Sequence, residues 1–410
     1  MTYRSLTLFF IFAFSFLTPA AQSRGTIAYV RGSTEIRLIS PDGSNDRRLW
    51  TDKALTSDLG IFELAWNPVG TELAFSSSHE QLNSPYMADI YTIQPDGTGL
   101  RRVTNPPDRA GLARLPKGSV TVKVVNNTPE SEGPPTFIIY VEGADEPQQA
   151  LIPPGATKVL TFKSVADLGR RPQMVIAMYG KYRWFVPGVN VVAGRAVTAP
   201  IFPILDQGFD LFGAFRPVWR ADGSRISFRN GICIISSVAA TPAAETAFEP
   251  FFAGKNPGGA CAWDWGPTAA LADQVIYTDN YPESNIYQMR EGGKHPGTKL
   301  TSFIDIPNQH VNDMHWMPDG TGVLYSTVNL FRDAANIFRY DIATKRTTQI
   351  TTLEKEFARV FSPSPDGRSI VFERCPTRDD EAGCNIWTIG MDGRGARELV
   401  KDGLRPAWGK

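Results

Sequence analysis

Short runs of alternating apolar and polar residues, separated by turns rich in Pro, Asp and Gly, recur along most of the chain. In one recurring phrase, an aromatic residue precedes such a turn and a short apolar strand comes after it. Copies are WNPVGTELAFSS from Trp66, WRADGSRISFRN from Trp219, a looser WGPTAALADQVIYT from Trp265, WMPDGTGVLYST from Trp316 and, without the Trp, PSPDGRSIVFER from Pro363. Alternation with period two predicts strands, and the Asp-Gly turns predict hairpins between them.

A second phrase comes after the first. It begins with a small residue or Asn/Asp, continues with Ile and an aromatic residue, and ends in a Gly turn and a polar-faced strand. Copies occupy 34–50, 88–104, 284–302, 335–351 and 384–400, with a degraded copy at 231–240. Each copy predicts strand, turn, strand, so the two phrases together predict about four strands per unit.

The spacing of the units predicts the fold class. From Trp219 the next copies begin 46 residues later at Trp265, then 51 later at Trp316, 47 later at Pro363 and 45 later at Trp408. A period of about 45–50 residues with four strands is typical of a β-propeller blade. Counting the units predicts an all-β, six-bladed propeller.

The first blade is predicted to be split between the two ends of the chain. Its innermost strand is the C-terminal LRPAWGK, and its outer strands are the N-terminal GTIAYVR and TEIRLIS together with the segment up to Trp50. We therefore expect 405–408 to pair with 26–30. Such a closure leaves no open sheet edge at the seam.

One interval is anomalous, because Trp66 and Trp219 are 153 residues apart. About 106 residues remain after one period is subtracted, and this stretch alternates in SVTVKVVNN, TFIIYVEG and TKVLTFKSV. It predicts a β-sandwich inserted between blades 2 and 3. The expected organisation is a signal peptide at 1–20, propeller blades 1–2 at 25–106, the sandwich at 107–208, and blades 3–6 with the closing strand at 209–410.

Charge and the N-terminus constrain the setting. The chain has 42 basic and 42 acidic residues, and nucleic-acid binding needs a basic surplus, so we expect no nucleic-acid partner. Arg4 precedes an apolar run to Leu17 and small residues around Ala20. This pattern predicts a cleaved signal peptide and a periplasmic or secreted protein, with an uncleaved anchor as the alternative. No other stretch is apolar enough to span a membrane.

The four cysteines are expected to form disulfides in an oxidising compartment. Cys375 and Cys384 flank the polar loop PTRDDEAG between two predicted strands, so they are predicted to bond with each other. Cys233 and Cys261 would then pair by elimination. A zinc site is disfavoured because no C-x-x-C spacing occurs and His is scarce.

The phrase x-W-s-P-D-G-t-x-[LIV]-x-[FY], with [DN]-I-[YFW] after it, resembles the WD-like repeats of TolB-type propellers. The resemblance covers 25–106 and 209–410 and implies a six-bladed propeller. Related propellers precede the catalytic domain of prolyl-oligopeptidase-type peptidases. Two features depart from the family: the α/β domain that precedes its propeller is expected to be absent, and the Ig-like sandwich has no counterpart there. A Tol–Pal role is therefore not carried over.

Motifs for catalysis are few. The chain has no G-x-S-x-G, which a serine hydrolase of the peptidase type needs. Some similar propellers are metal-dependent lyases with several His ligands, and here Asp313 lies between His310 and His315. These three residues form either a metal or acid/base cluster or a polar loop that leads into a strand. The Asp of each PDG turn and the recurring Trp are expected to be structural.

Residues three positions before each recurring Trp should border the central channel. They are Glu63, Arg216, Ala262, Asp313 and Arg405, and Arg359 and His315 are expected to join them. Their mixed charges fit either a binding mouth or a ring of structural ion pairs. We expect a monomeric, non-enzymatic binding or scaffold module without cofactor or metal, with an envelope protein or peptide as ligand and a glycan second. The alternative is a polysaccharide-active lyase or hydrolase with its site at the channel.

Overall fold

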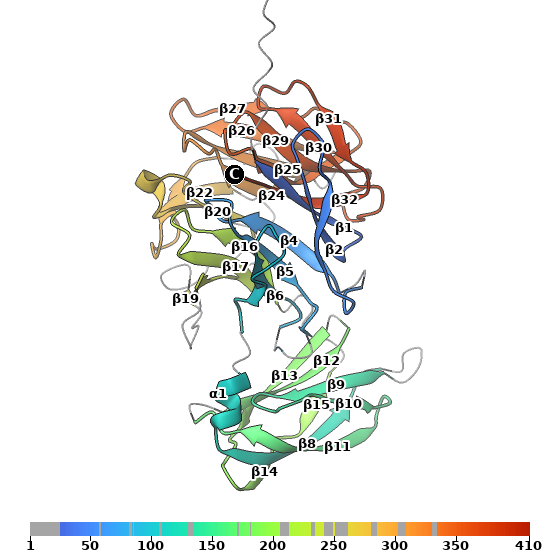
Figure 1. Cartoon of the computed structure of the whole chain (residues 1–410). Coiled ribbons are helices and arrows are strands. Elements are labelled where there is room, and N and C mark those ends of the chain that lie inside the picture. Colours follow the sequence, from blue (N-terminus) through green and yellow to red (C-terminus); the bar gives the residue numbers. More distant parts are fainter. Residues whose placement is uncertain are drawn as a thin grey trace, which may run out of the picture.

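The computed structural model describes most of the chain after residue 24 (Figure 1). The described residues are 25–56, 59–81, 84, 86–105, 109–129, 135–169, 172–180, 182–205, 213–230, 234–241, 249–250, 261–279, 285–301, 309–329 and 334–410. The predicted signal peptide lies outside them. No helix in the described residues combines the length and apolar character that a bilayer crossing requires.

Six four-stranded antiparallel units form the propeller within these residues (Figure 1). Blade 1 contains β1 (Thr26–Arg31), β2 (Glu35–Ile39), β3 (Arg47–Thr51) and β32 (Gly403–Gly409). Blade 2 contains β4 (Ile61–Trp66), β5 (Leu73–Ser77), β6 (Asp89–Ile93) and β7 (Arg101–Arg102). Blade 3 contains β16 (Ala214–Trp219), β17 (Arg225–Asn230), β18 (Ile234–Ala239) and β19 (Glu249–Pro250).

The remaining blades share the same plan. Blade 4 contains β20 (Trp263–Trp265), the short helix η2 (Ala269–Leu271), β21 (Gln274–Asp279), β22 (Asn285–Arg290) and β23 (Thr298–Lys299). Blade 5 contains β24 (Gln309–Trp316), β25 (Gly322–Asn329), β26 (Ala335–Asp341) and β27 (Arg346–Gln349). Blade 6 contains β28 (Phe357–Pro363), β29 (Ser369–Cys375), β30 (Asn385–Gly390) and β31 (Arg397–Val400). One bridge, Ala335 to Phe357, joins blades 5 and 6 into a single eight-stranded sheet.

The ring closes as the sequence predicts. Strand β32 pairs antiparallel with β1, with Trp408 opposite Ile27 and Ala407 opposite Ala28. The six innermost strands, β4, β16, β20, β24, β28 and β32, each contact the next around the channel, and β32 contacts β4. The chain is therefore an all-β, six-bladed propeller whose first blade combines both ends of the described chain.

The two repeated phrases have separate structural tasks. In the second phrase, Thr104 donates a hydrogen bond to the Asp89 carboxylate (2.6 Å) and accepts one from the Ile90 N–H (2.9 Å). Thr351 makes the equivalent contacts with Asn336 and Ile337, at 3.0 and 2.9 Å. These bonds fasten the start of the third strand of a blade to the end of its fourth strand.

The Asp of the first phrase shapes the turn, as predicted. The Asp222 carboxylate accepts hydrogen bonds from the N–H and the hydroxyl of Ser224, at 2.9 and 2.6 Å. Gly223 then adopts φ +71°, a left-handed conformation that glycine takes without strain.

The inserted β-sandwich comes after a short helix, α1 (Arg109–Arg114). One sheet contains β9 (Thr136–Val141), β10 (Gln148–Leu151), β12 (Gln173–Tyr179) and β13 (Tyr182–Val189). The other contains β8 (Lys117–Asn126), β11 (Thr157–Ala166), β14 (Ala196–Thr198) and β15 (Phe202–Ile204). Alternate β8 residues, Val120, Val122 and Val124, are fully buried in a core shared by both sheets. The predicted boundaries at 107 and 208 lie within 106–108 and 206–212, which are outside the described residues.

The sandwich lies beside blades 2 and 3 (Figure 1). Arg183 at the start of β13 is fully buried and donates a hydrogen bond to the Gln81 side-chain oxygen of blade 2 (2.7 Å). Its other hydrogen bonds go to the carbonyls of Gly180 and Tyr182. Because none of these acceptors carries a charge, burial lowers the pKa of Arg183 to about 10.

The predicted disulfide of blade 6 is present. Cys375 and Cys384 are bonded, with Cα atoms 4.1 Å apart, and they join β29 to the start of β30. Cys261 is also disulfide-bonded. Its predicted partner, Cys233, lies outside the described residues.

Candidate functional site

Bulges in the innermost strands turn side chains toward the channel. Five of these strands shift register near their middle, for example between Phe215 and Val218 in β16 and between Ala358 and Phe361 in β28. Arg216 and Arg405 adopt positive φ values of 52° and 51° at such shifts. A bulge bends its strand and re-aims a side chain, which is how polar residues come to face the channel.

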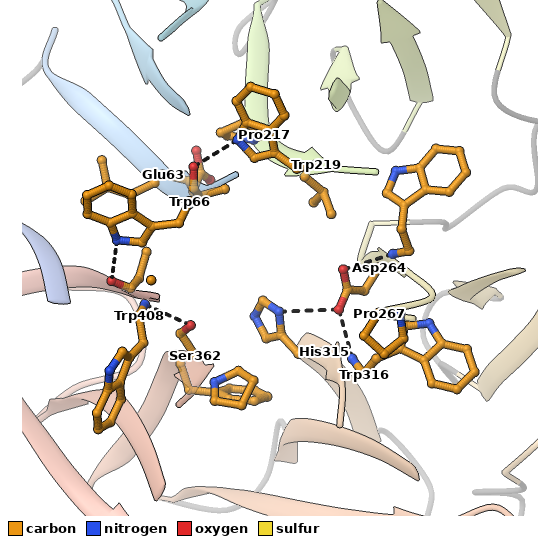
Figure 2. Close-up of a pocket in the computed structure, with 18 of the residues that line it drawn as sticks. Glu63, Trp66, Pro217, Trp219, Asp264, Pro267, His315, Trp316, Ser362 and Trp408 are labelled. Carbon is orange, nitrogen blue, oxygen red and sulfur yellow. Dashed lines mark hydrogen bonds and ion pairs between the residues drawn. The ribbon is translucent and has the colours of Figure 1, made fainter. Parts of the chain in front are cut away.

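A cavity of about 560 Å³ occupies the channel end where the recurring Trp residues lie (Figure 2). We call this end the Trp end. The mouth layer comes from the residue immediately before each Trp, or before Pro363 in blade 6: Ala65, Val218, Asp264, His315, Ser362 and Ala407. The deep layer lies two residues earlier on four of the same strands: Glu63, Arg216, Asp313 and Val360. All six blades therefore contribute to one cavity.

The deep layer is a set of paired charges. The Arg216 guanidinium lies 2.5 Å from an Asp313 carboxylate oxygen and also packs over the Trp263 ring. Glu63 accepts a hydrogen bond from the Arg216 N–H (3.2 Å) and lies 3.8 Å from the Arg229 guanidinium. These contacts join blades 2, 3 and 5 across the channel.

His315 projects into the cavity between two carboxylates (Figure 2). Its Nδ1 lies 3.6 Å from Asp264 and its Nε2 3.5 Å from Asp313. Burial alone would lower the pKa of His315, but the two carboxylates outweigh it and raise the pKa to about 9. Burial would likewise raise the pKa of Asp313, yet Arg216 and His315 hold it well below its usual range. The site therefore holds an imidazolium at neutral pH.

The carboxylates at the cavity also join neighbouring blades. Asp264 of blade 4 accepts the Trp316 N–H of blade 5 (2.8 Å), and Asp313 of blade 5 accepts the Phe361 N–H of blade 6 (3.1 Å). Glu63 acts in the same way between blades 2 and 3. These contacts agree with the ion-pair interpretation, one of the two that the sequence leaves open.

The recurring Trp residues contribute to the cavity wall, and the rings of Trp219, Trp316 and Trp408 point away from its centre (Figure 2). Trp265 and Trp316 are each only 2% exposed. The Trp66 indole N–H donates to the Ala407 carbonyl of blade 1 (3.2 Å), and that of Trp219 donates to the Ala65 carbonyl of blade 2 (3.1 Å). These contacts agree with the prediction that the rings are packing wedges.

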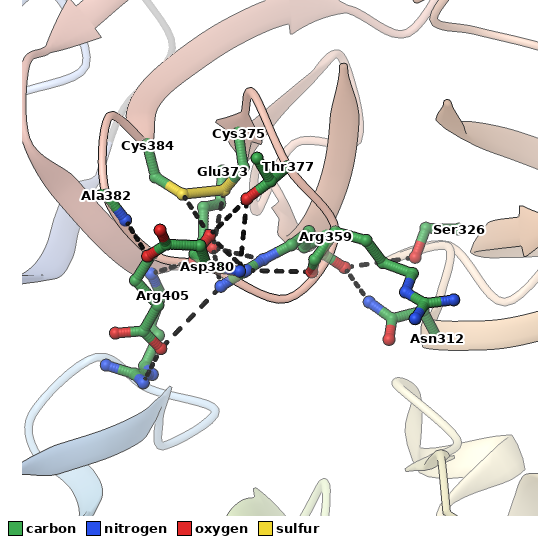
Figure 3. A network of polar contacts seen from close by, with 12 residues as sticks. Asn312, Ser326, Arg359, Glu373, Cys375, Thr377, Asp380, Ala382, Cys384 and Arg405 are labelled. Atoms are coloured by element: carbon green, nitrogen blue, oxygen red, sulfur yellow. Dashed lines mark hydrogen bonds and ion pairs between the residues drawn. A yellow bond between two sulfur atoms is a disulfide. The ribbon is translucent and has the colours of Figure 1, made fainter. Parts of the chain in front are cut away.

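Arg359 and Arg405 do not line the cavity. They belong to a network at the other end of the channel, beside the Cys375–Cys384 disulfide (Figure 3). Arg359 Nε donates to the fully buried Glu373 (2.9 Å), and its Nη1 donates to the carbonyls of Arg378 and Asp380 in the disulfide loop. The Arg405 N–H donates to Glu373 (2.8 Å), and the Arg405 guanidinium pairs with Glu381.

The structure therefore brings together Glu63, Arg216, Asp313 and His315 at one cavity. His310, expected beside Asp313 and His315, is buried in β24 and does not line the cavity, and neither does the buried Ala262. Sequence reasoning missed Val360, although it stands three before Pro363 as Glu63 does before Trp66. It also missed Asp264, which occupies the same position before Trp265 as His315 does before Trp316.

No protein-family model and no curated protein sequence matches this chain. Among solved structures, TolB from Acinetobacter baumannii is similar with a TM-score of 0.49 and 14% identity, over 95% of this chain and 67% of that chain. A chain of a nidogen/laminin complex gives 0.46 and 8%, over 94% and 99%. A putative 6-phosphogluconolactonase from Bacteroides uniformis gives 0.41 and 11%, over 94% and 100%. Because these TM-scores are below 0.5, the propeller assignment rests on the strand pairing within this chain.

Proposed function

We propose that this protein is an exported binding module whose Trp-end cavity receives a segment of another protein of the cell envelope. The observation that carries the proposal is the cavity of about 560 Å³, which all six blades line. A concave site of this size, formed by rigid strands and with a few polar groups converging on it, is typical of ligand binding.

The protonation and hydrogen bonding of the polar groups in the cavity favour ligand binding over catalysis. A general base must be unprotonated near the operating pH, whereas His315, with a pKa of about 9, carries its proton. Asp264, Asp313 and Glu63 accept backbone N–H groups from the neighbouring blade. These groups fix the shape of the cavity and its charge, which is the task of a receptor site.

Export is part of the proposal. The apolar N-terminal run with small residues after it indicates a signal peptide. The disulfide between Cys375 and Cys384 supports a periplasmic or secreted location, because such bonds persist in oxidising compartments. The ring closes on itself through β1 and β32, so the mature protein needs no second copy to cover a sheet edge and is proposed to act as a monomer.

A polysaccharide-active enzyme is the second candidate. The observation that favours it is the convergence of Asp264, Asp313 and His315 in the same cavity. A glycosidase also needs two carboxyl groups on opposite sides of a sugar, one of them free to donate a proton.

Selection from a random-sequence peptide library displayed on phage tests the proposed function. The bait is the full chain after residue 20, and the counter-bait is Ala65→Leu, which narrows the mouth layer. Enrichment of peptides on the unmodified chain alone supports peptide binding. If no peptide distinguishes the two baits, the proposal is wrong, and release of sugars from envelope polysaccharides would establish the enzyme instead.

A further inference from the structure

The charged residues of the mouth layer are confined to one side of the ring. Four of its six positions hold small side chains, namely Ala65, Val218, Ser362 and Ala407. The two charged positions, Asp264 and His315, stand next to each other on blades 4 and 5. A ligand entering from the Trp end therefore meets one polar pair and, around the rest of the ring, short side chains.

Most polar groups of this layer are already engaged. The two Asp264 oxygens accept the N–H groups of Trp265 and Trp316, at 2.9 and 2.8 Å. The Ser362 hydroxyl oxygen accepts the Trp408 N–H (3.0 Å).

The ring nitrogens of His315 make longer contacts than the other polar groups of this layer. Its two ring nitrogens lie 3.5 and 3.6 Å from carboxylate oxygens, beyond the usual 2.7–3.2 Å of an N–H···O bond. Its side chain is 27% exposed. The Ser362 hydroxyl accepts the Trp408 N–H and keeps its own O–H to donate, so His315 and Ser362 are the mouth-layer groups that can donate to a ligand, and His315 is the charged one.

We propose that the cavity selects an extended peptide segment with uncharged side chains, which fits the small residues of the mouth layer and accepts its anchoring hydrogen bond from His315 through a backbone carbonyl. This inference rests on the proposed function and adds the chemistry of the ligand. His315 is then the residue that orients the segment, and Ala65 and Ala407 are the residues that limit its width.

The charge arrangement explains why the segment must be uncharged. Arg216 is paired with Asp313, Arg229 lies near Glu63, and His315 lies between Asp264 and Asp313. Within the mouth and deep layers, a charged ligand side chain would lose water without gaining a free counter-ion, which is unfavourable in a cavity. Lys410 also lines the cavity, but it is exposed and keeps its water at the rim. An apolar or amide side chain carries no such cost.

The Trp rings argue for a peptide over a sugar. Sugar sites commonly offer an aromatic face, but Trp219, Trp265, Trp316 and Trp408 are each at most 7% exposed. Trp66 is half-buried, and its indole N–H is bound to the Ala407 carbonyl of blade 1. Small side chains facing the lumen instead leave room for the alternating side chains of an extended backbone.

The composition of selected peptides tests the uncharged requirement. Phage-displayed random peptides are selected on the full chain after residue 20, with Ala65→Leu as counter-bait and Val69→Leu as matched control. Val69 is 66% exposed on the turn after β4 and does not line the cavity. We expect enriched peptides to share an uncharged core and to bind Ala65→Leu about tenfold or more weakly. Their affinity for Val69→Leu should stay within a factor of about two.

Two other results have distinct meanings. Enriched peptides that share an acidic or basic core residue would overturn this inference and leave peptide binding in place. If no peptide distinguishes the unmodified chain from Ala65→Leu, the proposed function fails, and this inference with it.

Variants of His315 test the anchor, using one resynthesised peptide from the selection. His315→Phe should weaken binding about tenfold or more, because it removes a charged donor. His315→Gln should recover part of the loss, since its amide can donate. Binding to the unmodified chain should fall above pH 9 as the imidazolium loses its proton, whereas binding to His315→Gln should stay flat. Equal affinity of the unmodified chain and His315→Phe, or a flat pH profile for both, would overturn the anchoring role.

Discussion

At each end of the propeller channel a buried carboxylate joins two neighbouring blades, and we call this contact a clamp. The surroundings of the clamp differ between the two ends. At the Trp end, Asp313 accepts the Phe361 N–H of the next blade and pairs with Arg216. At the opposite end, Glu373 accepts the Arg405 N–H of the next blade and pairs with Arg359. A buried carboxylate joins two blades in both places, yet at the Trp end it borders a cavity and at the opposite end it borders the disulfide loop (Figures 2 and 3).

The two ends differ in the side chains that surround the buried carboxylate. At the Trp end the mouth layer is made of short side chains such as Ala65 and Ala407, so space remains between the clamps. At the opposite end two arginines converge on Glu373 and Glu381, and the loop carbonyls of Arg378 and Asp380 complete the network. The carboxylate clamps join neighbouring blades at both ends, and at the Trp end the short side chains beside them leave a cavity.

The largest expected effect comes from breaking the clamp beside the disulfide loop. Glu373→Ala removes a fully buried carboxylate and leaves Arg359 without its closest partner, which should destabilise the fold by about 3–5 kcal/mol. Denaturant unfolding measures the change. Glu354→Ala, at an exposed position, is the control and should stay within about 0.5 kcal/mol. If both variants unfold alike, Glu373 is not a clamp.

Removing the disulfide should have the next largest effect. Replacing Cys375 and Cys384 by Ser opens a loop closed over a sequence separation of 9 residues, and loop entropy predicts a loss of about 2–3 kcal/mol. Peptide binding at the Trp end should not change, because the loop lies at the other end of the channel. A variant that is as stable as the unmodified chain would show that Arg359 alone holds the loop.

The Trp end should be the more sensitive of the two to alkaline pH. The pKa of His315 is raised to about 9 in the folded state, so its stabilising contribution is complete below the unfolded pKa near 6.5. That contribution is lost as the pH rises through 9, and its size is on the order of 3 kcal/mol. The melting temperature should therefore fall between pH 7 and pH 10 in the unmodified chain and fall less in His315→Gln. Parallel profiles for the two proteins would contradict the ion pairing of His315.

The smallest expected effect on the propeller comes from removing the sandwich. The strands that flank the insertion are β7, which ends at the end opposite the Trp end, and β16, which starts there, so residues 107–208 are inserted away from the cavity. A chain in which a short Gly/Ser linker joins residue 106 to residue 209 should fold, because loop-closure entropy grows slowly with length. It should also bind the selected peptides unchanged. Loss of solubility or of a cooperative thermal transition would show that the sandwich belongs to the propeller core.

The propeller was predictable because its phrases repeat. The recurring Trp occurs in five of the six blades and an Asn or Asp before Ile in four, so their spacing predicted six units and the split blade. The sandwich was inferred from the anomalous interval between Trp66 and Trp219. The pairing of Cys375 with Cys384 was inferred from the predicted hairpin between them.

The site was predictable only in part, because it depends on where each bulge points. Counting three residues back from each recurring Trp gives the candidate positions. Of the residues found in this way, Glu63, Arg216 and Asp313 line the cavity. Arg405, counted in the same way, and Arg359, expected beside it, lie instead in the network at the other end of the channel, where the Arg405 guanidinium pairs with Glu381. Neither the direction of a long side chain nor the position of a bulge is fixed by sequence spacing.

The most direct test of the central claim compares the two ends in one binding measurement. A peptide selected on the unmodified chain is titrated against Ala65→Leu at the Trp end and against Glu381→Ala at the opposite end, with isothermal calorimetry as the readout. We predict that Ala65→Leu weakens binding about tenfold or more and that Glu381→Ala leaves it within a factor of about three. The reverse order of effects would contradict the claim that the small mouth layer at the Trp end is the ligand site.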